Sequence, residues 1–211
     1  MGSDKPAVRL AGVYAMAGLA DDWEENRQVC IDVLCAYLRM PYEPDPGSDA
    51  PTPQRLAFQA IREVRHTVIR VITAHLRKGA PTSWQGLHFD FCGVVFDGGD
   101  FSFAQLSGGG LEFQGARFCG GEVSFRYTQF CGADVYFRGA QFSGGKISFD
   151  HAEFSDGWVN FYEVEFSGSE ISFADARFSG GKVEFGSEFA GGTISFTGAH
   201  FSGSRVRFSM A

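Results

Sequence analysis

Val123-Ser-Phe125 is one copy of a motif that recurs between Leu87 and Ala211, and Ala140-Gln-Phe142 is one copy of a second motif that alternates with it. Together the two motifs and their connections repeat every 12 residues. A fixed period over this length predicts a solenoid, because each unit buries its apolar face only by stacking on its neighbours. Further copies of the first motif are Val135-Tyr-Phe137, Ile147-Ser-Phe149, Val159-Asn-Phe161, Ile171-Ser-Phe173, Val183-Glu-Phe185, Ile194-Ser-Phe196 and Val206-Arg-Phe208.

Each motif has a small or β-branched residue first and phenylalanine third. In an extended segment these two side chains lie on the same face, and this face should be the interior because most of the 23 phenylalanines occupy the third position. Glycine ends most of the alanine motifs, as at Gly120, Gly144 and Gly180, which predicts a corner that needs positive φ or leaves no room for a Cβ.

The middle residue of the first motif shows how many repeats make one coil. It is serine in every second repeat, at Ser124, Ser148, Ser172 and Ser195, and another residue in the repeats between them. Two alternating kinds of repeat predict a coil of 24 residues, in which like residues stack on one another. This register also stacks Glu122, Lys146 and Glu170, and a one-residue deletion at Gly186–Phe189 predicts a local defect near Ser187.

Tandem five-residue blocks with phenylalanine at the centre resemble the pentapeptide-repeat family. The resemblance covers residues 87–211 and departs from the family pattern in a two-residue insertion after every second block. It implies a right-handed quadrilateral β-helix. With the N-terminal helices described next, the fold class is predicted as α+β.

The first 80 residues predict a helical cap. We interpret residues 1–5 as the remnant of an expression tag or a disordered start, residues 6–80 as three helices with a proline-rich loop at 41–53, and residues 87–211 as the solenoid. Asp21 and Asp22 are expected to cap the second helix, with Glu24 and Glu25 in its first turn. The expected apolar surfaces are Val8, Leu10, Val13, Tyr14, Met16, Ala17 and Leu19 in the first helix, Trp23, Val29, Val33, Leu34, Tyr37 and Leu38 in the second, and Leu56, Ile61, Val64, Val68, Ile69, Val71, Ile72 and Leu76 in the third.

Composition places the chain among cytoplasmic proteins. No apolar run has the ~18 residues that a membrane span needs, and no signal peptide is visible. Five cysteines, an odd number, argue against a disulfide framework.

The sequence predicts neither an enzyme nor a cofactor or metal site. Glu63 and His66 have a spacing found in metal-binding helices, but no other helix supplies matching ligands. Cys119 and Cys131 occupy positions that are serine in later repeats, so small-residue packing explains them better than zinc.

The net charge of −7 lies entirely on the solenoid, where 15 acidic residues face 8 basic ones. Such a rod should not bind nucleic acid directly. Two hypotheses follow: a non-catalytic scaffold or protein-interaction module, and a DNA mimic that regulates a type II topoisomerase such as gyrase. The second is implied by the family resemblance, whereas basic residues that interrupt the acidic surface speak against it.

Two surfaces are candidates for contact with an unidentified protein partner or a second copy. The last coil has no helix after it, which predicts a homodimer through its exposed apolar side chains. The serine column predicts a flat surface strip that serves strand packing or docking. The dimer residues are Phe196, Phe201, Val206, Phe208 and Met210, and the strip is Ser124, Ser148, Ser172 and Ser195.

Overall fold

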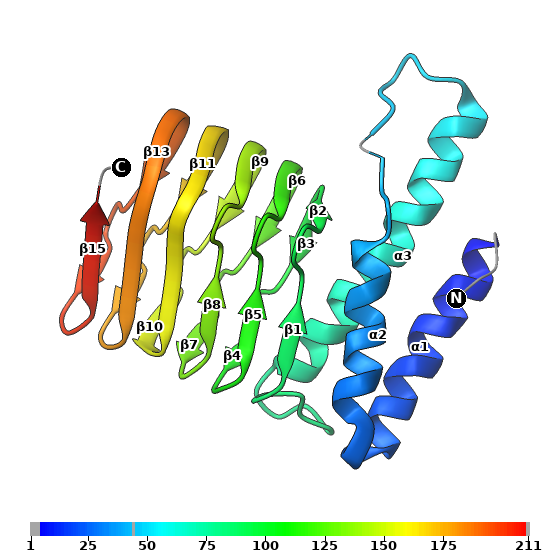
Figure 1. The fold of residues 1–211 in the computed structure, drawn as a ribbon, viewed down its shortest axis with the longest axis horizontal. Coiled ribbons are helices and arrows are strands. Elements are labelled where there is room, and N and C mark those ends of the chain that lie inside the picture. Colours follow the sequence, from blue (N-terminus) through cyan, green and yellow to red (C-terminus); the bar gives the residue numbers. More distant parts are fainter. Residues whose placement is uncertain (1–4, 44, 210–211) are drawn as a thin grey trace.

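The computed structural model describes residues 5–43 and 45–209 and shows three helices followed by a parallel β-solenoid of about five turns (Figure 1). The α+β fold and the 24-residue coil are therefore confirmed. The helices are α1 (Pro6–Asp22), α2 (Arg27–Arg39) and α3 (Thr52–Leu76), with a short 3-10 turn at Glu24–Asn26. The strands are β1 (His88–Asp90), β2 (Val95–Phe96), β3 (Gly99–Asp100), β4 (Gln105–Leu106), β5 (Gly110–Glu112), β6 (Arg117–Ser124), β7 (Gln129–Cys131), β8 (Asp134–Tyr136), β9 (Gln141–Ser148), β10 (Glu153–Asp156), β11 (Trp158–Ser172), β12 (Arg177–Phe178), β13 (Lys182–Ser195), β14 (His200–Phe201) and β15 (Arg205–Ser209).

Strand pairing fixes the register of the coils. Lys146 of β9 pairs with Glu122 of β6 on one side and with Glu170 of β11 on the other, and Ser148 pairs with Ser124 and Ser172 in the same way. All of these pairs are parallel, as expected when each coil lies on the one before it.

The deletion predicted near Ser187 also appears in the pairing. Tyr162 pairs with Gly186, an offset of 24 residues, whereas Glu165 pairs with Glu188, an offset of 23. The register therefore shifts between these two pairs, and β11 and β13 absorb the missing residue as an irregularity in their ladder.

The core consists of four ladders of stacked phenylalanine rings that run through the coils. In one ladder, Phe125, Phe149 and Phe173 stack with ring centroids 4.9 and 4.8 Å apart and nearly parallel planes. These spacings match the distance between neighbouring strands, so each ring rests on the equivalent ring of the next coil. The ladders are Phe91–Phe113–Phe137–Phe161–Phe185–Phe208, Phe101–Phe125–Phe149–Phe173–Phe196, Phe96–Phe118–Phe142–Phe166 and Phe130–Phe154–Phe178–Phe201.

Glycine is required at the corners for two separate reasons. A Cβ on Gly144 would lie 3.1 Å from the carbonyl oxygen of Cys119 in the coil below. Gly145, the next residue, has a φ of +78°, and a Cβ there would overlap the carbonyl group of Gly121. At this corner a Cβ would therefore be crowded at both glycines, and the positive φ belongs to the second of them.

Another corner carries side chains where glycine is usual. Phe103, Tyr127 and His151 have φ values of 63°, 57° and 57°, in the left-handed region. Their rings stack outside the coil with centroids 5.0 and 4.8 Å apart. This stacking continues the 24-residue register on the surface of the rod.

Helices α2 and α3 cover the first coil, and α1 packs on the outside of this pair (Figure 1). Helix α2 contacts β1, and α3 contacts β3. The third helix begins at Thr52, as predicted, with proline in its first turn.

The faces of the first two helices differ from the sequence-based prediction. In α1, Val13 and Ala17 are buried, but Val8, Tyr14 and Leu19 are exposed. Trp23, Val29 and Val33, predicted to lie in the core stripe of the second helix, are exposed as well, as are Leu56 and Ile61 of α3. Helices α2 and α3 lie between α1 and the first coil, and the positions of each helix that face none of these neighbours are exposed.

The predicted cap of the second helix is also wrong. Asp21 and Asp22 lie in the last turn of α1, and α2 begins only after Asn26, whose side chain makes no capping bond. Asp21 instead accepts a hydrogen bond from the indole of Trp84 at 2.9 Å and lies 3.1 Å from His75. This carboxylate therefore connects α1 to α3 and to the entry of the solenoid.

We predict that rings in the middle of the ladders and rings at their C-terminal end differ strongly in their contribution to stability. Phe149 is fully buried between two rings, so Phe149→Ala should lower the free energy of unfolding by about 3–5 kcal/mol. Phe201 lies in the last coil and is 53% exposed, so Phe201→Ala should cost much less. Equilibrium urea denaturation of both variants measures this, and equal losses would contradict the ladder as the source of stability.

Candidate functional site: the Asp97 cluster

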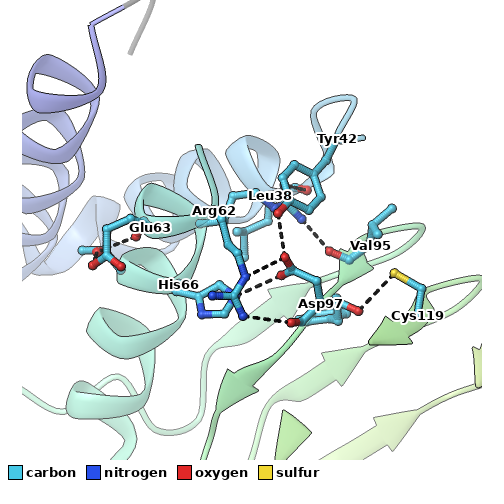
Figure 2. Close-up of polar contacts among 11 residues, drawn as sticks. Leu38, Tyr42, Arg62, Glu63, His66, Val95, Asp97 and Cys119 are labelled. Carbon is cyan, nitrogen blue, oxygen red and sulfur yellow. Dashed lines mark hydrogen bonds and ion pairs between the residues drawn. The ribbon is translucent and has the colours of Figure 1, made fainter. Parts of the chain in front are cut away.

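Asp97 is the centre of a polar cluster between the helical cap and the solenoid (Figure 2). It directly follows β2 in the first coil. Arg62 and His66, four residues apart on α3, present their side chains to it from one face of that helix. Tyr42 reaches it from the loop that follows α2. Three segments of the cap and solenoid thus meet at one carboxylate.

The carboxylate of Asp97 has partners on both oxygens. Its Oδ2 accepts hydrogen bonds from the Tyr42 hydroxyl at 2.7 Å and from Arg62 Nε at 2.9 Å. Its Oδ1 lies 3.0 Å from His66 Nε2. Arg62 also donates to the carbonyl oxygen of Asp97 at 3.2 Å, so it binds both the side chain and the backbone of this residue.

Arg65 provides a second polar connection beside the first. It is only 4% exposed and donates from its two terminal nitrogens to the carbonyl oxygens of Leu38 and Val95, at 2.7 Å each. Its guanidinium lies 4.2 Å from the centroid of the Tyr42 ring. A buried charge without partners would be costly, and these contacts compensate it while joining α2, α3 and β2.

Hydrogen bonds and charge control the ionisation of the cluster. Burial alone would raise the pKa of Asp97, but the hydrogen bonds from His66 and Tyr42 and the charges of His66 and Arg62 outweigh it and lower this pKa to about 2. Burial, together with the bond to Asp97, raises the pKa of Tyr42 above its usual range. Asp97 is therefore a carboxylate and Tyr42 a neutral donor at neutral pH.

Two grooves border the cluster. One, of about 450 Å³, is lined by residues of α3 such as Arg62 and His66 together with Glu122 and Arg126 of the solenoid. The other, of about 520 Å³, is lined by Phe58, Asp97 and Gly121 among others. Acidic and basic side chains are mixed along the first groove, and its two serine hydroxyls, on Ser102 and Ser124, hydrogen bond to each other at 2.7 Å.

These contacts support a mechanical role for the cluster. Each described partner of Asp97 belongs to the cap, whereas Asp97 itself belongs to the first coil. The bonds hold α3 and the loop after α2 on the open end of the solenoid, where unpaired strand edges and phenylalanine rings would otherwise meet water.

The residues singled out in the sequence lie in different places. Glu63 and His66 do not converge, because Glu63 pairs with Arg70 at 2.6 Å and His66 turns to Asp97. The serine column is in register, but Ser148 is 0% and Ser172 only 8% exposed, so at these positions it is a buried seam and not an exposed strip. Ser172 donates to the carboxylate of Asp150, which the neighbouring coil supplies. Use of the column by a partner stays a prediction.

The predicted dimer residues lie in the last coils. Phe208 and Phe201 are 64% and 53% exposed, and Phe196 and Val206 are partly buried. Met210 lies outside the described residues. The exposed rings are thus at the end of the rod opposite the helical cap (Figure 1).

Asp90, Cys92 and Glu112 form a further group that sequence reasoning missed, with ligand atoms within 4.8 Å of one another. Asp90 is bound by Arg39, and the thiol of Cys92 lies 3.3 Å from the side-chain oxygen of Gln114. Burial and the neighbouring Asp90 raise the pKa of Cys92 to about 12, which keeps the thiol protonated. A protonated thiol and an arginine-bound carboxylate are poor metal ligands.

Comparison of the chain with models of protein families, with curated proteins and with solved structures finds no match. In the described part of the chain, the helices are too short or too polar to cross a membrane. The phenylalanine repeat therefore remains the basis of the resemblance to pentapeptide-repeat proteins.

We predict that Asp97→Asn loosens the cap. Because the pKa of Asp97 is lowered in the folded state, its stabilising contribution is present above pH ~4 and is lost as the pH falls towards 2. After solvent screening this contribution is on the order of 1–2 kcal/mol. Urea denaturation at several pH values should show a lower free energy of unfolding for the variant at pH 7. Below pH ~4, the free energy of unfolding of the variant should fall less steeply with decreasing pH than that of the parent.

The matched control is Glu63→Gln, which removes an exposed ion pair from the same helix. It should change the free energy of unfolding by less than about 0.5 kcal/mol. An Asp97→Asn protein as stable as the parent at pH 7 would contradict the fastening role.

Proposed function

We propose that this protein is a non-catalytic β-solenoid scaffold, a member of the pentapeptide-repeat family that acts in the cytoplasm through protein–protein contact. The observation that carries the proposal is the difference between the two ends of the rod. The cap is fastened by Asp97 and Arg65 at one end, whereas the last coil leaves Phe208 64% exposed at the other.

The open end is the proposed interaction surface. Phe208 stacks on Phe185 at 4.9 Å but has no ring on its other side among the described residues. Phe201 stacks on Phe178 at 4.6 Å and is exposed in the same way. A second copy placed end to end would continue these ladders, and burial of each ring would contribute about 1.5–3 kcal/mol against the entropic cost of association.

The proposed contact is therefore a two-fold dimer through the last coil, because one surface that is complementary to itself closes with two copies. Its residues are Phe196, Phe201, Val206, Phe208 and Met210.

Light scattering on the intact chain and on a Phe208→Asp variant tests this contact. We expect end-to-end association of the intact chain and its loss in the variant, because a carboxylate cannot be buried in a stack of rings without a partner. Tyr162→Asp is the control, since Tyr162 is similarly exposed on the side of the rod. An intact protein that is monomeric at tens of micromolar, or a Phe208→Asp protein that associates like the parent, would refute the end-to-end contact.

A second candidate function is DNA mimicry, favoured by the excess of 15 acidic over 8 basic residues on the solenoid. The local arrangement weighs against it: Lys146 lies between Glu122 and Glu170, Arg138 pairs with Glu163 at 2.8 Å, and other basic side chains neutralise their neighbours in the same way. A gyrase supercoiling assay separates the two functions. Inhibition at low micromolar protein would favour mimicry, and none at high concentration would favour the scaffold.

A further inference from the structure

The outward face of α1 is apolar along nearly its whole length. The helix packs against the rest of the cap through Val13, Ala17 and Ala20, which are buried. Its opposite side is exposed and carries no charge before Asp22. A helix that is apolar on all sides is normally covered on all sides, so this face indicates a missing neighbour. The exposed residues are Ala7, Val8, Ala11, Tyr14, Ala15, Gly18 and Leu19.

The shape of this face suits another helix. At 100° per residue, small residues fall along its middle and larger ones along its rims, with Val8 and Leu19 on one side and Tyr14, which is 60% exposed, on the other. A line of small side chains lets two helix axes approach closely, while the rims enclose the contact. The small residues are Ala7, Ala11, Ala15 and Gly18.

We propose that this face binds the same face of a second copy, with the two α1 helices antiparallel. If Ala11 faces the partner's Ala15, then Val8 faces the partner's Gly18, and Leu19 faces the partner's Ala7. Val8 and Leu19 of one rim thus each lie level with a small residue of the partner. A two-fold axis through the middle of the contact generates the same three contacts again from the other chain.

Charge at the two ends of α1 favours the same orientation. Lys5 precedes the helix, and Asp22, Glu24 and Glu25 follow its exposed face at the other end. Antiparallel pairing brings Lys5 of each copy to the acidic end of its partner, and it also sets the two helix dipoles in opposition. Parallel pairing would instead place the acidic ends together.

This contact is separate from the proposed contact of the last coil, because the cap and the last coil lie at opposite ends of the rod (Figure 1). The experiment therefore uses the Phe208→Asp chain, in which only the cap contact is left. Sedimentation equilibrium across the micromolar range should show a dimer. Adding Ala11→Glu and Ala15→Glu should raise its dissociation constant by at least about tenfold, because both charges would be buried in the contact.

Matched controls separate association from folding. Ala36→Glu on α2 and Ala57→Glu on α3 make the same change at exposed positions of the cap and should leave the dimer intact. Circular dichroism should show an unchanged melting temperature for all of these variants. Lys5→Glu should weaken the dimer, and combining it with Asp22→Lys should restore it, since the exchanged charges face each other again.

The inference would be overturned by a Phe208→Asp chain that is monomeric throughout, by a dimer that survives Ala11→Glu and Ala15→Glu, or by a Lys5→Glu effect that Asp22→Lys does not reverse. Co-sedimentation of the Phe208→Asp chain with phosphatidylcholine–phosphatidylglycerol vesicles, abolished by Ala11→Glu, would likewise overturn it and assign the face to a lipid surface. A different result would refute only the proposed contact of the last coil. In that case Phe208→Asp would leave the association of the parent protein unchanged, while Ala11→Glu and Ala15→Glu would dissociate it.

Discussion

Ring-on-ring stacking between successive coils is the interaction on which the rest of this structure depends. A phenylalanine side chain is large enough that four of them fill the cross-section of a 24-residue coil, and its flat ring has a stacking distance close to the separation of hydrogen-bonded strands. The backbone ladder and the side-chain ladder therefore have one repeat distance in common. Neither has to distort to accommodate the other, which explains ring planes within a few degrees of parallel over most of the rod.

The same stacking creates a problem at each end, since a first coil has no coil beneath it. On the N-terminal side, helices cover the first coil. Because helices cannot continue a strand ladder, they must be attached to the coil by other contacts. Side chains do this: Arg65 donates to the carbonyl oxygen of Val95, and Thr73 donates to that of Asp100, at 2.8 Å. Polar groups of the first coil that have no strand partner below them are thus satisfied by α3.

The repeat region could be predicted closely from the sequence because its signal is periodic. Alternation of serine with other residues in the first motif was sufficient for the 24-residue register, and a single missing residue was sufficient to locate the shift near Ser187. These inferences hold because every coil makes the same contacts, so an error in the assignment of one repeat is corrected by the next.

The cap and its polar cluster could not be predicted in this way. The apolar residues of α1 surround the helix, so no stripe identifies its buried side. Asp97 is 35 residues from Arg62 and 55 from Tyr42, and nothing periodic connects them. Asp21 looks locally like a helix cap, yet a tertiary contact with Trp84 determines its place. Single contacts between distant residues leave no pattern in one sequence, although an arginine and a histidine four residues apart on α3 were a usable hint of an acidic partner.

Each coil adds the same length to the rod, so the length of the rod changes in equal steps when coils are added or removed. Duplication or loss of one 24-residue segment would insert or remove a slab about 4.8 Å thick, without a new kind of contact in the interior. The cap would still meet the same first coil, and the terminal rings would still be the same rings. Gene-level duplication can therefore adjust the separation between the two ends of the molecule while leaving the chemistry of each end untouched. A protein built in this manner is suited to serve as a spacer of graded length.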